Sequence, residues 1–583
     1  MIKTLLKSLR EHKKGSVITI LLSILEAAFE IFIPLCMAKV IDEGIDVGSM
    51  GAVGRYGMLL LLFAFFQLVT GVLSAHIAAK TSVGFSTNLR QDMYDNVQTF
   101  AFSNIDKFST ASIVTRLTTD VTNIQNAYQM LIRMAIRGPI MLVFSMLVSF
   151  RINRTISLIF LVVIPVMTAL LLLIIKNVNP IFGRVFRTYD NLNNVVQENV
   201  RGIRVVKSFN REQYETDKFK AISGQIYRDF AKGERLLAFN SPIMQFFMYA
   251  CTILISWIGA KAIVVSGNNA TLGLTTGDLT ALLSYAMQIL MSLMMLSMVF
   301  AMITISIASA QRIAELLEEK TDIANPEQPV TEVKDGSIRF EQVDFVYASK
   351  ADKKVLDNIN LTIASGETVG IIGGTGSSKS SLVQLIPRLY DVTGGRLTVG
   401  GTDVRDYDLD TLRNAVAMVL QKNELFSGTI RENLRWGNEN ATDEELTEAC
   451  KLACADEFIQ AFPEKYDTYI EQGGTNVSGG QKQRLCIARA LLKKPKVLIL
   501  DDSTSAVDTK TDATIQKSFA EYIPDTTKII IAQRVSSVQH ADQIVVLDDG
   551  KIAAVGKHEE LMKTSAIYRE VYESQQKGEK DHE

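Results

Sequence analysis

The chain has 583 residues, 47% of them apolar, and its 61 basic and 63 acidic residues leave a formal net charge of −2. Because there is no excess of basic residues, the composition argues against a nucleic acid as a partner. The five cysteines are scattered without a Cys-x-x-Cys pair, so we expect reduced packing residues rather than disulfides or a zinc site.

Long apolar segments are concentrated in the first half of the chain. A membrane-spanning helix needs about 20 mostly apolar residues. The six segments that meet this length are approximately residues 16–38, 57–79, 132–150, 156–175, 242–265 and 279–304. Six such segments favour a membrane domain over a buried helical core. The basic N-terminus is placed in the cytosol, and the even number of spans leaves the second half of the chain there too.

Two long polar segments separate these spans, at about residues 80–131 and 176–241. They contain few helix breakers, so we expect helices that extend well past the bilayer, with cytosolic turns near residues 108–112 and 208–212. A connection of this length favours a docking role over a simple connector.

Two carboxylates lie inside the first predicted span. Glu26 and Glu30 are four residues apart and therefore share one helix face. Carboxylates at membrane depth are costly and generally line a cavity or pair with a cation. We expect them to line a substrate cavity, and a structural pair or an interface position is the alternative.

The sixth predicted span carries a stripe of methionines on one helical face. Methionine side chains are adaptable and recur on promiscuous binding surfaces, so the stripe is a second candidate for the substrate cavity. Ordinary helix packing explains the pattern equally well. The stripe consists of Met287, Met291, Met294 and Met298, followed by Met302.

From about residue 336 onward, short strands alternate with helices. Residues 367–372 predict a strand that runs into a glycine-rich loop, and residues 381–389 predict the following helix, which is the context that a phosphate-binding loop requires. The backbone N–H groups of such a loop and the helix N-terminus cradle phosphates. The loop reads Gly373, Gly374, Thr375, Gly376, Ser377, Ser378, Lys379, Ser380 and Ser381.

Individual positions of this loop have separate roles. Lys379 can reach the terminal phosphates of a nucleotide, and the Ser380 hydroxyl can ligate magnesium. Ser378 stands where the motif has its last glycine, so a Cβ is added where the backbone lies near phosphate. Further on, the apolar run 496–500 ends at Asp501 and predicts a buried parallel strand that delivers a carboxylate to the magnesium of the nucleotide.

Together with the segment 476–481, which reads Asn-Val-Ser-Gly-Gly-Gln, these motifs resemble the ATP-binding cassette (ABC) transporters, specifically the half-size exporters. The resemblance covers nearly the whole chain. It implies an α-helical six-span transmembrane domain at residues 1–320. An α/β P-loop ATP-binding cassette domain would follow at 336–575, and a polar tail at 576–583. It also implies ATP and Mg²⁺ as cofactors.

The resemblance assigns roles to further residues. Tyr347 looks like the aromatic that stacks on adenine, and Gln421 looks like the glutamine that senses magnesium and contacts the membrane domain. Residues 505–508 look like the D-loop. The signature that closes over the partner's ATP is matched by Ser478, Gly479, Gly480 and Gln481.

Two positions depart from the family pattern. Asp502 stands where the family has its catalytic glutamate, and the side chain is one methylene shorter; a 1 Å misplacement can lower a rate about 10²-fold. Gln533 stands where the family has its switch histidine, and glutamine carries no charge. Gln472, before the signature, also replaces a frequent Glu. The combination with an intact signature resembles the degenerate-site subunit of a heterodimeric bacterial exporter.

The sequence therefore predicts a subunit of an ATP-driven exporter in the bacterial cytoplasmic membrane. Its expected partners are a second half-transporter, membrane lipids and an amphipathic small molecule, drug or peptide as substrate, and no nucleic acid. A homodimeric exporter or lipid flippase, in which Asp502 is active enough, is one alternative. A non-transporting ATP sensor that regulates another membrane protein is the other.

Overall fold

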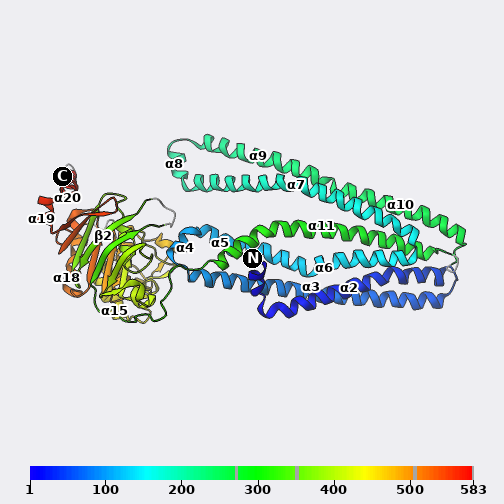
Figure 1. Ribbon diagram of the computed structural model, residues 1–583, viewed down its shortest axis with the longest axis horizontal. Helices are drawn as coiled ribbons and strands as arrows, with labels where there is room; N and C mark the ends of the chain where they lie inside the picture. Colours follow the sequence, from blue (N-terminus) through cyan, green and yellow to red (C-terminus); the bar gives the residue numbers. More distant parts are fainter. Residues whose placement is uncertain (270–272, 348–352, 503–508, 581–583) are drawn as a thin grey trace. The chain divides into compact units, whose positions relative to one another are not determined.

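The computed structural model describes residues 1–269, 273–347, 353–502 and 509–580. Its internal contacts divide the chain into two units. The first combines Met1–Gln98 with Thr110–Glu319, and the second combines Thr99–Ser109 with Lys320–Glu583. Figure 1 shows that the first unit consists of long helices and that the second contains strands and shorter helices.

Six helical segments of the first unit are long and apolar enough to cross a membrane, and each contains one of the predicted spans. They are Arg10–Ile45, Met50–Gln98, Thr110–Ile152, Arg154–Arg201, Glu212–Ser266 and Thr276–Glu318. The six-span prediction is therefore confirmed. The elements are α1 (Ile2–Lys7), α2 (Lys13–Lys39), α3 (Met50–Gln98), α5 (Thr110–Thr115), α6 (Val121–Ile152), α7 (Arg154–Arg201), α8 (Ile203–Ser208), α9 (Glu212–Ala238), α10 (Asn240–Ser266) and α11 (Thr276–Glu318).

Local capping explains where several of these helices begin and end. The Asn153 side chain accepts a hydrogen bond from the backbone N–H of Ile156 and starts α7 directly after α6. Thr275 caps α11 in the same way. Gly267 ends α10 with a φ of +64°, a left-handed conformation that glycine adopts without a steric penalty.

Helices α2, α3, α6 and α11 pack against one another, and α7 packs along α9 and α10. An apolar core lies between α2, α6 and α11, and it includes Ala27, Ile31, Met141 and Tyr285. The buried Tyr285 hydroxyl donates a 2.6 Å hydrogen bond to the Ile31 carbonyl oxygen, which ties α11 to α2 inside the apolar layer.

The two cytosolic turns differ from each other. The second lies between α8 and α9, within the predicted 208–212. At the first, the chain leaves α3 at Gln98 and forms a short helix, α4 (Phe102–Lys107), before α5 begins at Thr110. The prediction of 108–112 therefore marked only the end of this turn. The Asn104 side chain accepts from the Ala101 backbone N–H and stabilises α4, a local effect without a periodic sequence signal.

The second unit is built on a six-stranded sheet with the order β12-β11-β3-β10-β9-β6; among these described strands, only β12 is antiparallel to its neighbour. A four-stranded antiparallel sheet, β2-β1-β4-β5, and a β7-β8 pair accompany it. The strands are β1 (Ile338–Phe345), β2 (Leu356–Ile363), β3 (Thr368–Gly373), β4 (Gly394–Val399), β5 (Thr402–Asp403), β6 (Val416–Val419), β7 (Gly428–Thr429), β8 (Tyr469–Ile470), β9 (Val497–Asp501), β10 (Thr527–Ile531), β11 (Gln543–Asp548) and β12 (Lys551–Gly556).

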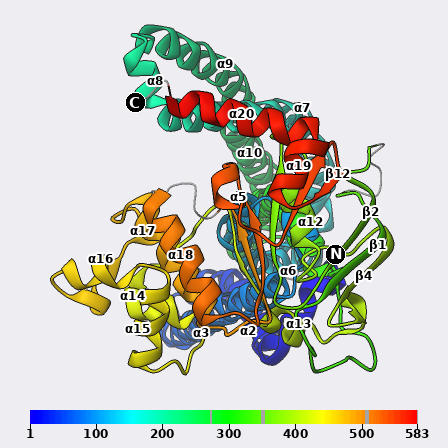
Figure 2. The same ribbon diagram turned by 90° about the vertical axis from the view of Figure 1, so that its left-hand side faces the viewer.

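Helices surround this sheet, and Figure 2 shows β1, β2 and β4 on one side of the unit and α14 to α17 on the other. The helices are α12 (Lys379–Gln384), α13 (Leu409–Ala415), α14 (Ile430–Arg435), α15 (Asp443–Leu452), α16 (Asp456–Ala461), α17 (Gly479–Leu491), α18 (Thr509–Tyr522), α19 (His558–Thr564) and α20 (Ala566–Lys580).

The central strands are apolar on both faces because both faces are covered. In β9, Ile499 belongs to the core shared with the antiparallel sheet, whereas Leu498 and Leu500 belong to the core under the helices. All five residues of β9 are buried, and the strand pairs in parallel with β6 and β10. The predicted buried parallel strand ending at Asp501 is thus confirmed.

Candidate nucleotide-binding site

A cavity of about 570 Å³ opens at the carboxyl ends of β3, β9 and β10. In open α/β sheets this edge is where ligands bind. The cavity brings together the whole predicted phosphate loop and four more of the predicted residues, Gln421, Asp501, Asp502 and Gln533. Ile531 and Val571 complete the lining. Val571 comes from the C-terminal helix α20, and no sequence motif pointed to it.

Two features shape the backbone of the loop: close packing of Gly373 against β11, and the left-handed backbone conformation of Ser378. A Cβ at Gly373 would lie 2.2 Å from the Leu547 carbonyl oxygen, so only glycine fits against β11. Ser378 adopts φ +71° and ψ +24° just before α12, which explains why the motif has glycine there. Holding a non-glycine residue in this conformation costs roughly 1–2 kcal/mol.

The helix that follows is shorter than predicted. The expected range was 381–389, but α12 runs from Lys379 to Gln384. It begins directly after the left-handed Ser378, and the chain turns again at Arg388, whose φ is +52°. The Arg388 guanidinium pairs with Asp391 and holds this turn.

The Lys379 ammonium group lies inside the curve of the loop. Nζ donates to the carbonyl oxygens of Gly373 at 2.8 Å and Gly374 at 2.9 Å. Burial lowers the pKa of Lys379, and the negative charges of Asp501 and Asp502 oppose that shift. A half-buried cation with three donors can form stronger, charge-assisted hydrogen bonds with phosphate oxygens than with these neutral carbonyls.

Ser380 and Asp501 are brought together as predicted for a magnesium site. The Ser380 hydroxyl donates to Asp501 Oδ1 at 3.1 Å. Burial raises the pKa of Asp501, and the adjacent charge of Asp502 adds to the increase. The structure therefore offers a hydroxyl, a carboxylate and, at Gln421, an amide. These hard oxygen ligands suit Mg²⁺, which is held by few protein groups together with nucleotide phosphates.

Asp502 lies between two amide side chains. Gln533 Nε2 donates to Asp502 Oδ2 at 2.6 Å. Burial raises the pKa of Asp502, and the hydrogen bonds from Gln421 and Gln533 act in the opposite direction. Asp502 also has a left-handed backbone, with φ +49°. The short carboxylate is thus held toward Gln533 by a neutral donor, which stabilises it as an acceptor without supplying positive charge.

The backbone around Gln533 is fixed by a residue that sequence reasoning missed. Gln575 on α20 donates through Nε2 to the Gln533 carbonyl oxygen at 2.7 Å. Its Oε1 accepts from the Val535 backbone N–H at 2.9 Å. One side chain therefore fixes the backbone directly after the Gln533 side chain, on both sides of Arg534.

Tyr347 does not line the cavity but lies beside it. Its hydroxyl is 2.8 Å from Ser381 Oγ on α12, and 45% of the residue is exposed. An exposed aromatic face next to the phosphate loop is available for stacking on a flat ring.

The signature residues do not line this chain's own cavity either. Ser478 caps α17: its hydroxyl accepts from the Gln481 backbone N–H, and its own N–H donates to Gln481 Oε1 at 2.9 Å. This reciprocal capping fixes the helix start at Gly479 and Gly480. The N-terminus of α17 therefore carries the partial positive charge that favours anions. Residues 505–508, the D-loop of the sequence prediction, lie outside the described residues.

In the membrane unit, Glu26 and Glu30 share one cation, Arg137, which no sequence pattern indicated. Arg137 on α6 donates through Nη1 to Glu26 Oε1 at 2.9 Å and through Nη2 to Glu30 Oε2. Glu26 is 5% exposed, and its second oxygen, Oε2, has no hydrogen-bond partner among the described residues. The two carboxylates thus form an ion-paired triad with Arg137, and their exposure to a substrate cavity stays a prediction.

The four methionines Met287, Met291, Met294 and Met298 project away from the interior of the described chain, with 49%, 60%, 43% and 61% of each residue exposed. Packing inside this chain therefore does not explain the stripe. The exposed methionines are therefore available to contact a substrate, a lipid or a second subunit.

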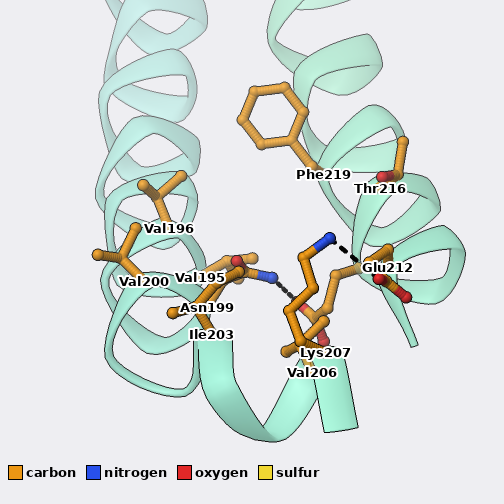
Figure 3. Close-up of a pocket in the computed structure, with 11 residues that line it drawn as sticks. Val195, Val196, Asn199, Val200, Ile203, Val206, Lys207, Glu212, Thr216 and Phe219 are labelled. Carbon is orange, nitrogen blue, oxygen red and sulfur yellow. Dashed lines mark hydrogen bonds and ion pairs between the residues drawn. The ribbon is translucent and has the colours of Figure 1, made fainter. Parts of the chain in front are cut away.

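A separate apolar cleft of about 320 Å³ lies at the second cytosolic turn, between α7, α8 and α9. In Figure 3, Val196 and Val200 come from α7 and Phe219 from α9. The Lys207–Glu212 ion pair, 3.0 Å long, closes the base of the turn. Phe209 at the turn is 73% exposed. This apolar tip has the character of an interaction surface.

Comparisons with known proteins match both units. Residues 16–294 match the family described as ABC transporter transmembrane region, and residues 356–505 match the family described as ABC transporter. The uncharacterized ABC transporter ATP-binding protein YfiB of Bacillus subtilis is 36% identical over 558 residues, which cover 96% of each chain.

Two further relatives have more specific names. The ATP-dependent lipid A-core flippase of Desulfotalea psychrophila is 33% identical, with 89% of each chain covered. The putative multidrug export ATP-binding/permease protein YgaD of Bacillus subtilis is 30% identical over 98% of this chain and 99% of that protein. The solved structure of a bacterial Atm1-family ABC exporter with ATP bound has the same fold, with a TM-score of 0.81, 24% identity and 97% and 98% coverage.

Proposed function

Because the chain belongs to the ABC transporter family, as an exporter half-transporter with one membrane domain and one ATP-binding domain, we propose that it is the degenerate-site subunit of a heterodimer. The heterodimer couples ATP hydrolysis to the outward movement of amphipathic small molecules, drugs or peptides. It resides in the bacterial cytoplasmic membrane with the ATP-binding domain in the cytosol.

The site is equipped to bind ATP with Mg²⁺. Lys379 and the loop N–H groups hold the phosphates, and Tyr347 stacks on the base. Ser380, Asp501 and Gln421 hold the magnesium ion, which when bound supplies positive charge to the phosphates. The partly buried Ser380–Asp501 hydrogen bond and the inward Lys379 support this assignment.

The observation that carries the proposal is the Asp502–Gln533 pair. A general base must reach the proton it removes within about 2.6–3.2 Å. Asp502 has a short side chain whose Oδ2 is already bonded to Gln533. Gln533 donates a hydrogen bond but brings no positive charge to a phosphate. This chain's own site therefore binds ATP and hydrolyses it slowly.

The intact signature of this chain supports the existence of a partner subunit whose own site is competent for ATP hydrolysis. Ser478 and Gln481 form the complete capping box at the start of α17, so this part of the chain is intact. In the proposed heterodimer, it closes over the ATP that the partner binds. The exposed apolar tip around Phe209 supports a second subunit as well, because an uncovered surface of this kind is costly in water.

A homodimeric exporter or lipid flippase is the second candidate. The 33% identity with a lipid A-core flippase favours it, and Asp502 is still an acid in the cavity.

Purification of the chain alone in lipid nanodiscs distinguishes the two candidates. A fluorescent ATP analogue should bind at micromolar concentration while turnover stays low, and addition of a second half-transporter with Glu and His at the two positions should restore turnover. Robust turnover by a verified homodimer, abolished by Asp502→Asn, would contradict the heterodimer.

A further inference from the structure

We propose that a second cavity of the ATP-binding unit, formed by α18, β10 and the segment 536–541, binds a small adenine nucleotide such as AMP at a site separate from the phosphate loop. The cavity has a volume of about 460 Å³, within the range of small-molecule sites. Among the described residues, it shares none of its lining with the cavity at the phosphate loop. Its occupation does not depend on how the Asp502 site works.

Two buried polar atoms of α18 indicate a ligand at one end of this cavity. Asp512 and Gln516 line it and lie four residues apart, so they share one helix face. Asp512 is 7% exposed, and its Oδ2 accepts a 2.7 Å hydrogen bond from Ser537 Oγ. Asp512 Oδ1 and Gln516 Nε2 are buried and have no hydrogen-bond partner among the described residues. Since unpaired buried polar groups are costly, an occupant that pairs with both atoms is favoured.

The two free atoms define the edge of that occupant. A carboxylate oxygen only accepts hydrogen bonds, and the amide nitrogen of glutamine only donates them. The complementary group therefore presents a donor beside an acceptor. Adenine does so with its N6 amino group and an adjacent ring nitrogen, and a carboxamide offers the same pair.

Lys528 supplies a cation at the other end of the cavity. This β10 residue lines the cavity and is 4% exposed. Its Nζ donates to the carbonyl oxygen of Ile523, the residue that follows α18, at 3.1 Å. Burial lowers the pKa of Lys528, and the negative charges of Asp542 and Asp525 oppose that shift. An ammonium group has three donors, so Lys528 can also bind an anion with several acceptor oxygens, such as phosphate.

The separation between the two ends selects a nucleotide over a shorter amide. Ile523 follows Gln516 by seven residues, which corresponds to about 10 Å along a helix. A ligand that reaches both ends is therefore elongated. Ile530 and Phe519 add apolar surface to the lining, which suits a flat ring. A free amino-acid amide is too short for this cavity, whereas the ribose of AMP separates the base from the phosphate.

The site is connected to the backbone that follows Gln533. Ser537, which donates to Asp512, lies two residues after Val535, whose backbone N–H is held by Gln575. A ligand that fixes Asp512 therefore also restrains the segment 536–541. Hydrogen exchange of this segment gives a readout that is independent of ATP hydrolysis.

The test uses the full chain in lipid nanodiscs and radiolabelled AMP as the probe. Equilibrium binding of AMP is measured, and hydrogen exchange of residues 509–522 and 536–541 is compared with and without it. Adenosine, which lacks the phosphate, is measured in parallel. Lys379→Ala removes the cation of the phosphate loop and so separates the two cavities.

Three variants test the lining. Asp512→Asn replaces an acceptor by a donor, and Gln516→Glu does the reverse, both at nearly constant shape. Lys528→Met removes the cation and keeps an apolar side chain of similar length. Thr514→Ala is the control, because Thr514 lies on α18 but is exposed and is not part of the cavity lining.

We expect AMP to bind the wild type and Lys379→Ala with similar affinity and to slow exchange of both segments. Asp512→Asn and Gln516→Glu should each weaken AMP binding by roughly tenfold or more, because each leaves a buried group of the complex unpaired. Lys528→Met should weaken binding of AMP more than binding of adenosine. Thr514→Ala should match the wild type.

Four results would overturn the site. Loss of AMP binding in Lys379→Ala would mean that AMP binds at the phosphate loop. Binding that is unchanged in both Asp512→Asn and Gln516→Glu would place AMP elsewhere, and equal weakening in Thr514→Ala would reflect a general disturbance of α18. If the wild type binds neither AMP nor adenosine at millimolar concentration, ordered water alone serves the polar atoms of the cavity.

Discussion

Gln533 Nε2 lies 2.6 Å from Asp502 Oδ2 and donates a hydrogen bond to it. The bond joins two residues that follow the carboxyl ends of the paired strands β9 and β10, and it occupies one oxygen of the carboxylate. This contact couples the two departures from the family pattern, so neither residue can be understood alone.

The coupling predicts that both residues must be changed to raise activity. Asp502→Glu alone adds the missing methylene but leaves the amide of Gln533 to hold the carboxylate. The double variant Asp502→Glu/Gln533→His should raise turnover at this chain's site by about 10²-fold, whereas each single variant should gain far less. The ATPase rate of the chain in lipid, with a Lys379→Ala version as the blank, measures this. Additive gains from the two single changes would contradict the coupling.

Gln575 should matter for the same reason. Gln575→Ala removes two hydrogen bonds, to the Gln533 carbonyl oxygen and to the Val535 backbone N–H, each contributing about 0.5–1.5 kcal/mol. We expect faster hydrogen exchange at residues 531–535 and, in the Asp502→Glu/Gln533→His background, a turnover several-fold lower. Ser574→Ala, one position earlier on the same helix and exposed, is the control and should change neither. Equal behaviour of the two variants would show that the bridge has no effect.

Arg137 should be required for the stability of the membrane unit. Arg137→Met leaves Glu26 and Glu30 without their shared cation, and removal of one partner of a buried ion pair costs about 3–5 kcal/mol. Thermal unfolding in lipid should show a clear loss. Arg133→Met is the control, because Arg133 lies one turn earlier on α6 and the described residues give it no ion-pair partner. The triple variant in which Gln replaces both acids and Met replaces Arg137 should regain much of the stability.

The same triad gives a transport prediction. If Glu26 and Glu30 line the cavity, replacement of both by Gln should alter export of a cationic dye more than export of a neutral one of similar size. Efflux assays with the two dyes, at matched expression levels, test this. Equal effects on both dyes would restrict the triad to a structural role.

Much of the site could be predicted because it is encoded locally. The phosphate loop, Ser380 and the β9 strand that ends in Asp501 follow from short motifs in which spacing and chemistry are adjacent in the sequence. The six spans follow from length and hydropathy alone. Asp502 and Gln533 were recognised as departures, but their direct hydrogen bond could not be foreseen, because it depends on the pairing of β9 with β10.

The missed residues act across long sequence separations. Arg137 meets carboxylates more than 100 positions earlier, and Gln575 meets a backbone segment about 40 positions earlier. Neither of them belongs to a local pattern. Only the end of the first cytosolic turn was predicted, because the short helix α4, stabilised by Asn104, has no periodicity to detect.

The assignment of the degenerate site to this chain is tested by the ATPase rate of the assembled heterodimer carrying either Gly480→Asp or Lys379→Ala in this chain. A carboxylate at Gly480 would place charge against the phosphates bound by the partner, so Gly480→Asp should nearly abolish turnover. Lys379→Ala affects only this chain's slow site and should be milder, with lower affinity for a retained nucleotide. If Lys379→Ala abolishes hydrolysis while Gly480→Asp leaves it near the wild-type rate, with assembly verified for both, the competent site belongs to this chain and the assignment is wrong.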